Sequence, residues 1–198
     1  MVMRAIFAYG NSTLRIALRL AVIALASLCV MSVAAQEDQD FSTMSGVDAN
    51  EEGKRLYRAK DYDAALPYLQ LASEWGFKDA QFRLGQIYFK GLGATERNPL
   101  RGLAWLGTAA SKPTSPQMEK GFQSSLEKVS EEHRAAVDRT VAAYAKLYGS
   151  GAAAVTCRMQ RPLGSNLSQL ACDYDKSYSY TKPAKSAWEE HESSAFAL

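Results

Sequence analysis

The residues best suited to acid–base or metal chemistry are two histidines that lie beside glutamates. His133 follows Glu131 and Glu132, and His191 lies within the run WEEHE at residues 188 to 192. An imidazole next to a carboxylate can transfer protons or bind a transition metal. The first group, however, has the composition of a solvated helix start, and the second lies in a segment without apolar periodicity. We therefore predict no catalytic residue, no metal site and no cofactor.

A nucleophile is also hard to place in this chain. The sequence contains no G-x-S-x-G string, which is the usual mark of a serine held on a sharp strand-to-helix turn. We therefore predict that the protein is not an enzyme. An envelope hydrolase with a helical domain remains the least favoured alternative, because it needs a catalytic group that the sequence does not supply.

Two cysteines have a spacing that favours a structural role. Fourteen residues separate Cys157 from Cys172, which matches neither the C-x-x-C of oxidoreductases nor a zinc ligand set. Short segments flank a Pro-Leu-Gly-Ser-Asn turn between them. The third cysteine, Cys29, lies in the N-terminal apolar run described below. An even pair in an exported chain predicts one disulfide, which closes a C-terminal loop or hairpin.

The elements that must position these residues are helices. Apolar residues recur at helical spacing from about residue 47 to 148, and no run there alternates long enough to indicate a sheet. Asp61, Asn98 followed by Pro99, and Ser115 are typical N-caps, and Gly91 is a typical helix end. These signals predict six helices, at about residues 47 to 60, 61 to 76, 78 to 90, 98 to 111, 115 to 129 and 130 to 149.

The second and fourth predicted helices repeat each other. A shift of 37 residues superimposes a cap, small residues, an aromatic residue and leucines. Repeats of this length are typical of helical arrays in which each hairpin packs against the next. The superimposed pairs are Asp61 with Asn98, Ala65 with Gly102, Leu66 with Leu103, Tyr68 with Trp105, Leu69 with Leu106 and Ala72 with Ala109.

The pattern A-x-x-x-L-G-x-x-Y-x-x-G-x-G at residues 80 to 93, followed by Asn98 and AWLGTAA at 104 to 110, resembles a Sel1-like repeat. Residues 53 to 76 resemble a shortened copy, and Pro113 departs from the family's final glycine. The resemblance implies an all-α fold, a short α-solenoid of antiparallel helical hairpins that serves as an interaction platform. Because about three units are usually needed for a stable array, the last two helices or a homodimer must supply a third layer.

Side chains next to the small-residue seam of such an array point outward and are candidates for partner binding. This geometry selects a mostly cationic set, which suits a protein or peptide ligand with an acidic segment. The candidate residues are Arg55, Arg58, Arg83, Gln86 and Lys90.

The N-terminus has the pattern of a secretory signal peptide. Arg4, Arg15 and Arg19 precede an apolar run at residues 20 to 35, and Val33 and Ala35 fit a cleavage site. An uncleaved membrane anchor is the alternative, although 16 residues is short of the roughly 20 needed to span a bilayer. Cleavage removes three of the 23 basic side chains and none of the 21 acidic ones. The near-neutral mature chain is not expected to bind nucleic acid.

These patterns predict a modular chain that is periplasmic or secreted. We expect an interaction scaffold or adaptor of the cell envelope, with a membrane-anchored regulatory or assembly factor as the alternative. Membrane contact is expected only through an uncleaved N-terminus. The predicted parts are a signal peptide at 1 to 35, a flexible lead-in at 36 to 46, the helical repeats at 47 to 148, a cysteine-bearing extension at 149 to 176 and a disordered tail at 177 to 198.

Overall fold

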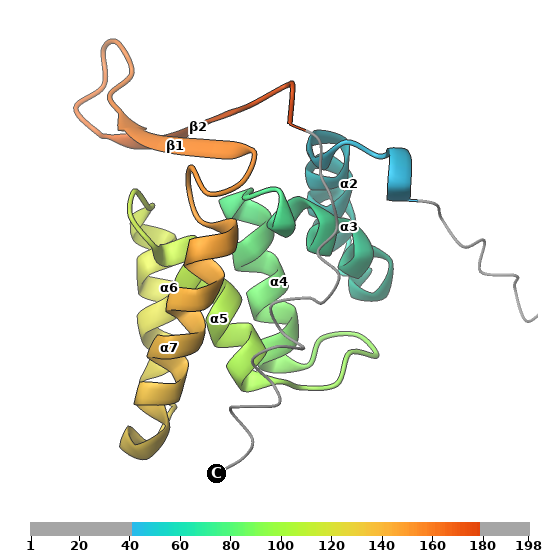
Figure 1. The fold of residues 1–198 in the computed structure, drawn as a ribbon, viewed down its shortest axis with the longest axis vertical. Helices are drawn as coiled ribbons and strands as arrows, with labels where there is room; N and C mark the ends of the chain where they lie inside the picture. The colour runs from blue at the N-terminus through green and yellow to red at the C-terminus, as the bar shows by residue number, and fades with distance from the viewer. Residues whose placement is uncertain (1–40, 179–198) are drawn as a thin grey trace, which may run out of the picture. The chain divides into compact units, whose positions relative to one another are not determined.

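Six α-helices and two β-strands follow a short 3-10 helix in the part of the chain that the computed structural model describes, residues 41–178 (Figure 1). The expected signal peptide and nearly all of the expected tail lie outside these residues. Within them, no helix combines the length and apolar content needed to cross a membrane. The elements are η1 (Phe41–Thr43), α2 (Gly46–Arg58), α3 (Tyr62–Glu74), α4 (Lys78–Lys90), α5 (Pro99–Ala110), α6 (Pro116–Leu126), α7 (Glu131–Tyr148), β1 (Val155–Gln160) and β2 (Gln169–Tyr174).

The helices begin and end at the predicted signals. The Asp61 carboxylate accepts a hydrogen bond from the backbone N–H three residues later, at the start of α3. Asn98 Oδ1 does the same for the Arg101 amide at 3.0 Å, and Pro99 follows as the first residue of α5. Gly91 ends α4 with a φ of 66° in the left-handed region, which glycine adopts without steric cost. These local interactions fix the lengths of the helices.

Small residues let paired helices approach closely. A Cβ added at Gly85 of α4 would lie 2.8 Å from the Leu106 amide nitrogen of α5, and one at Gly53 of α2 would lie 2.9 Å from the Leu69 Cδ2 of α3. Neither contact leaves room for a methyl group. Each repeat is therefore a tight antiparallel hairpin, α2 with α3 and α4 with α5.

The last two helices add a third layer to the two hairpins. Trp105 of α5 is 1% exposed, and its ring centroid lies 4.9 Å from that of Tyr144 and 5.2 Å from that of Tyr148 on α7. Gln81 Nε2 of α4 donates a hydrogen bond to the Tyr148 carbonyl at 2.7 Å. Met118 places α6 in a second apolar cluster with residues of α4, α5 and α7. The terminal helices thus bury the outer surface of the second repeat.

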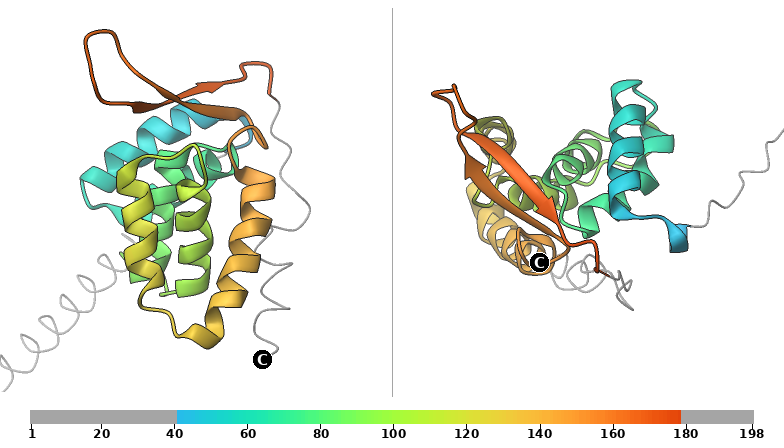
Figure 2. Two further views of the ribbon diagram at one scale, coloured as in Figure 1. Left: turned by 90° about the vertical axis from the view of Figure 1, so that its left-hand side faces the viewer. Right: turned by 90° about the horizontal axis from the view of Figure 1, so that it is seen from above.

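The C-terminal extension forms a disulfide-closed β-hairpin. Strands β1 and β2 pair antiparallel with Cys157 opposite Cys172, and the two cysteines form a disulfide. Val155 is fully buried near Gly76, at the junction of α3 and α4, and Figure 2 shows the ribbon lying across that end of the helices. The predicted disulfide and the predicted fold class, an all-α solenoid with a closed hairpin, are confirmed.

Candidate functional site

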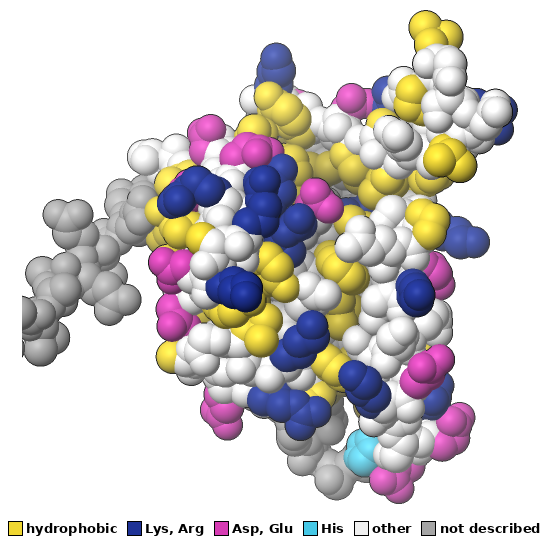
Figure 3. All heavy atoms as spheres, turned by 180° about the vertical axis from the view of Figure 1, so that it is seen from behind, with side chains coloured by type: hydrophobic (Ala, Val, Ile, Leu, Met, Phe, Trp, Pro, Cys, Tyr) yellow, Lys and Arg dark blue, Asp and Glu magenta, His cyan; other side chains and the backbone are white. Residues whose placement is uncertain are grey.

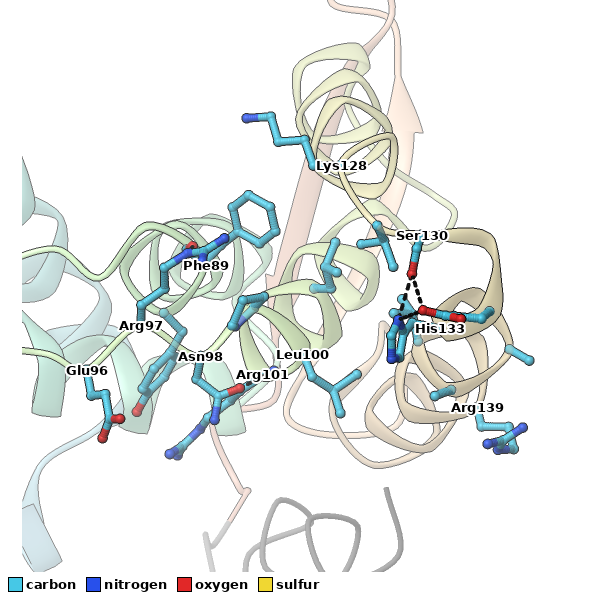
Figure 4. Close-up of a pocket in the computed structure, with 18 of the residues that line it drawn as sticks. Phe89, Glu96, Arg97, Asn98, Leu100, Arg101, Lys128, Ser130, His133 and Arg139 are labelled. Carbon is cyan, nitrogen blue, oxygen red and sulfur yellow. Dashed lines mark hydrogen bonds and ion pairs between the residues drawn. The ribbon is translucent and has the colours of Figure 1, made fainter. Parts of the chain in front are cut away.

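A groove opens where the end of α4 meets the start of α5 and the first half of α7. Its walls include the loop between α4 and α5 and the connection between α6 and α7. The groove has a volume of about 1410 Å³, and Figure 4 shows side chains that line it. Two separate parts of the sequence form this one surface, within residues 88–103 and 128–139.

The inner wall of the groove is apolar. Phe89 is 6% exposed and packs in one cluster with Leu103 and Val137, and Leu100 and Val129 are partly buried against the same cluster. These side chains come from α4, α5, α7 and the residues after α6. The wall therefore exists only because the second repeat is packed against the terminal helices.

Two arginines of the groove are positioned by the second repeat. Arg97 Nε donates a hydrogen bond to the Phe89 carbonyl at 3.2 Å. The Arg101 guanidinium lies over the Tyr88 ring, with Cζ 4.2 Å from the ring centroid. Burial raises the pKa of the Tyr88 hydroxyl, although the Arg101 charge opposes this shift. Tyr88 stays neutral at physiological pH and presents the face of its ring to a cation.

The groove carries more cations than acids. Lys128 approaches from the end of the α6 segment, with Nζ 5.7 Å from the Phe89 ring centroid, and Arg139 comes from α7. The N-terminus of α5 adds the partial positive charge of a helix start to the same wall. The lining cations are Arg97, Arg101, Lys128 and Arg139, and the lining acids are Glu96 and Glu132.

His133 lies at the edge of the groove in the first turn of α7. Its Nδ1 lies 2.7 Å from the Ser130 hydroxyl and 3.5 Å from a Glu132 carboxylate oxygen, and its side chain is exposed. Among residues 41–178 there is no group of three or more His, Cys, Asp or Glu side chains arranged to hold a metal ion. These contacts fit the interpretation of His133 as part of a solvated helix start.

The structure brings together part of the surface predicted from sequence. The Tyr57 hydroxyl of α2 donates a hydrogen bond to Gln86 Oε1 of α4 at 2.6 Å, and the Arg83 guanidinium carbon lies 5.8 Å from the Tyr57 ring centroid. Burial raises the pKa of Tyr57, with Arg83 opposing the shift. Tyr57, which was not predicted as a site residue, is the side chain that joins the α2 and α4 parts of this surface.

Arg55 does not join this group. Residues two positions apart on an α-helix are separated by about 200° around its axis, so Arg55 points away from the side on which Tyr57 meets α4. Its guanidinium instead pairs with Glu52, with an Nε–Oε2 distance of 2.8 Å. Arg58 is exposed and donates to the Lys54 carbonyl at 3.1 Å, so its side chain follows its own helix.

The predicted residues of α4 share one face of that helix. Arg83, Gln86 and Lys90 have the i, i+3 and i+7 spacing of a single helix face, and we call them the α4 row. Lys90 directly follows Phe89, whose side chain lines the groove. Figure 3 shows one face of the molecule, on which Lys and Arg side chains gather along the middle with hydrophobic side chains between them. The row therefore ends one residue away from the groove along the chain.

Sequence reasoning missed the groove itself. Lys128 and Arg139 belong to a connection and a terminal helix that lack the repeat pattern, and Arg97 lies in the loop of the second repeat outside the positions quoted for the repeat pattern. The sequence held one indication of a second buried surface on α4: Tyr88 and Phe89 are adjacent, so their side chains must face different ways. The structure shows the result: both rings are buried, with Tyr88 in the main core and Phe89 in the second cluster behind the groove.

Comparisons with known proteins identify the repeats. A family model, the Sel1 repeat, matches residues 46–76 and again residues 78–113. Comparisons with curated proteins and with solved structures give no match. Sel1 repeats are generally modules of protein–protein interaction, and the family is typically non-catalytic. The first match spans α2 and α3 and the second spans α4 and α5. The chain therefore carries two consecutive Sel1 repeats, one for each helical hairpin.

Proposed function

We propose that this protein is an exported adaptor of the cell envelope that binds an acidic segment of a partner protein in the groove and along the α4 row. One observation carries the proposal: a single groove of about 1410 Å³ combines an apolar wall with an excess of cationic side chains. Arrays of helical hairpins bind through such surfaces, with a few anchor residues that supply most of the affinity.

The two chemical parts of the groove select different features of the ligand. Phe89, Leu103 and Val137 offer an apolar surface against which a ligand side chain loses water, at roughly 25 cal/mol per Å² of buried area. The arginines bind carboxylates, because a guanidinium presents paired donors that match a carboxylate. A basic ligand is repelled by the same charges. The preferred ligand is therefore a segment with an aromatic or aliphatic side chain among acidic residues.

Binding is tested with three synthetic peptides that each contain one tryptophan. The tryptophan is flanked by glutamates in the first peptide, by serines in the second and by lysines in the third. Fluorescence anisotropy should give the highest affinity for the glutamate peptide. The double substitution Lys128→Glu/Arg139→Glu should weaken its binding about tenfold or more, since each tenfold corresponds to about 1.4 kcal/mol. Lys120→Glu/Lys146→Glu is the matched control for two charge reversals, because both lysines are exposed and neither is among the groove residues.

Equal affinity for the three peptides would overturn the proposed acidic ligand. Equal weakening by the groove variant and by Lys120→Glu/Lys146→Glu would show that net charge, and not the groove, determines binding. Arg83→Glu/Lys90→Glu extends the test to the α4 row. A ligand that crosses from the row into the groove should lose affinity in both double variants.

Export rests on the N-terminal sequence and on the disulfide. The basic start, apolar run and small residues at 33 and 35 have the order of a signal peptide, and structural disulfides persist in oxidising compartments such as the periplasm. Mass spectrometry of the protein from envelope fractions tests this part. A mature N-terminus near Gln36 supports cleavage, whereas retention of residues 20–35 supports the membrane-anchored regulatory or assembly factor.

A further inference from the structure

We propose that the acidic segment Trp188–Glu192 of this same chain occupies the groove in cis and competes there with the partner's acidic segment. This inference rests on the proposed function, because it assigns an internal competitor to the same site. It makes the groove a regulated one, in which an external ligand must displace a segment that is already tethered.

The composition of the segment matches the ligand that the groove selects. The run WEEHE places Trp188 directly before Glu189 and Glu190, with Glu192 close behind. Three carboxylates face a lining in which four cations outnumber two acids, and the indole supplies an apolar anchor for the Phe89 wall. The preceding residues Ser179–Ala187 contain Lys182 and Lys185 and no acidic residue, and residues 193–198 contain none either, so within residues 179–198 the acidic charge is confined to the proposed segment.

The length of the intervening chain permits this contact. The last described residue, Tyr178, packs its ring against Trp75 with centroids 5.3 Å apart, next to the start of α4. The groove lies at the other end of α4, whose 13 residues span about 20 Å at 1.5 Å per residue. The nine residues 179–187 can bridge up to about 30 Å, because an extended chain covers roughly 3.3 Å or more per residue.

A tethered ligand also has an energetic advantage over a free one. A short linker gives the attached segment an effective concentration in the millimolar range. Even a weakly binding segment then occupies its site for much of the time. The apparent affinity for an external competitor falls in proportion to the fraction of protein molecules whose groove is empty. Contact in cis needs no second copy, so occupancy is independent of protein concentration.

The first experiment compares the mature full-length protein with its Glu189→Gln/Glu190→Gln/Glu192→Gln variant. The probe is the glutamate peptide with one tryptophan, followed by fluorescence anisotropy. We expect the variant to bind the probe at least about fivefold more tightly than the wild type. The matched control, Glu51→Gln/Glu119→Gln/Asp173→Asn, removes the same charge from α2, α6 and β2 and should leave the affinity unchanged.

The second experiment observes the groove without any peptide. In ¹H–¹⁵N correlation spectra, the triple variant should shift the backbone amide signals of Arg97 and Arg101 and leave those of Leu69 and Ala72, on α3, in place. Unchanged signals at Arg97 and Arg101 overturn the inference, whether or not the probe binds. Shifts that depend on protein concentration also overturn it, because they assign the contact to a second copy.

The two proposals fail in distinguishable ways. If the wild type and the triple variant bind the probe equally, through the groove, the competition is overturned and the proposed function stands. If neither protein binds the probe but the amide signals shift, the groove holds its own segment and the proposed external ligand is wrong.

Discussion

Gly102 of α5 faces the backbone of Phe89 of α4 so closely that a Cβ added at Gly102 would lie 2.5 Å from the Phe89 amide nitrogen. The same Phe89 forms part of the apolar wall of the groove. The seam that holds the second repeat together therefore also sets the position of a binding residue. A change at Gly102 reaches the groove through one backbone contact.

Gly102→Ala should lower the free energy of unfolding by about 2 kcal/mol or more, since overpacking a tight contact typically costs 1–3 kcal/mol and backbone atoms cannot rotate away. Because Phe89 must shift, affinity for the glutamate peptide should fall as well. Urea denaturation and anisotropy measure the two effects. Gly121→Ala is the comparison: its Cβ would meet Cε2 and Cζ of the Phe82 ring, which can turn aside, so its cost should be smaller. Equal costs would contradict the assignment of the Gly102 contact.

Lys78 is a buried cation at the end of α5. It is 2% exposed, and its ammonium donates to the Ser111, Ala109 and Thr108 carbonyls at 2.6, 3.1 and 3.3 Å. The end of a helix leaves its last carbonyls without an N–H partner in the helix. Here the Thr108 carbonyl also accepts from the Ser111 N–H and hydroxyl, and the Ala109 carbonyl also accepts from the Thr114 hydroxyl. Lys78→Met should destabilise the protein by about 1.5–3 kcal/mol near pH 7, because the hydrogen bonds of a charged donor are lost. The exposed Lys112→Met should cost less than about 0.5 kcal/mol.

The same lysine predicts a pH dependence. Burial lowers the pKa of Lys78 from 10.5 to about 8, so between these values the unfolded chain binds more protons than the folded one. The free energy of unfolding then rises with pH through this group. The wild-type advantage over Lys78→Met should thus grow from pH 8 to about pH 9.5, as measured by urea denaturation of both proteins. An advantage that stays constant or shrinks would show that the pKa is not lowered.

Reduction of the Cys157–Cys172 disulfide should loosen the ribbon and spare the helices. A two-stranded sheet is only marginally stable alone, and closing a loop of this length contributes about 3 kcal/mol in the chain-entropy account. Hydrogen exchange should show lost protection of the β1 and β2 amides in dithiothreitol, with α4 and α5 unchanged. The Cys157→Ser/Cys172→Ser variant should behave like the reduced protein. Full protection of its strands would show that packing of Val155, and not the disulfide, holds the ribbon.

The sequence determined the local elements of this fold. Asp61, Asn98 and Gly91 satisfy backbone groups within a few residues of themselves, so their types alone indicate where helices start and stop. The 37-residue repeat predicted the hairpins, because a small residue must recur wherever two helices cross closely. The cysteine pair predicted the closed hairpin, since its spacing excluded the common redox and zinc motifs.

Only the tertiary structure decided which charges share a surface. Arg55 and Arg83 have the same chemistry and similar places beside the seam, yet the rotation of α2 that brings Tyr57 to α4 turns Arg55 away. The groove joins residues 88–103 to residues 128–139, which belong to helices without the repeat signature. Helical periodicity indicates which side of each helix is buried, but it does not identify the neighbouring helix that covers that side. The structure identifies this neighbour through the contacts between α5 and α7, and Arg97, Lys128 and Arg139 thereby lie around one apolar wall.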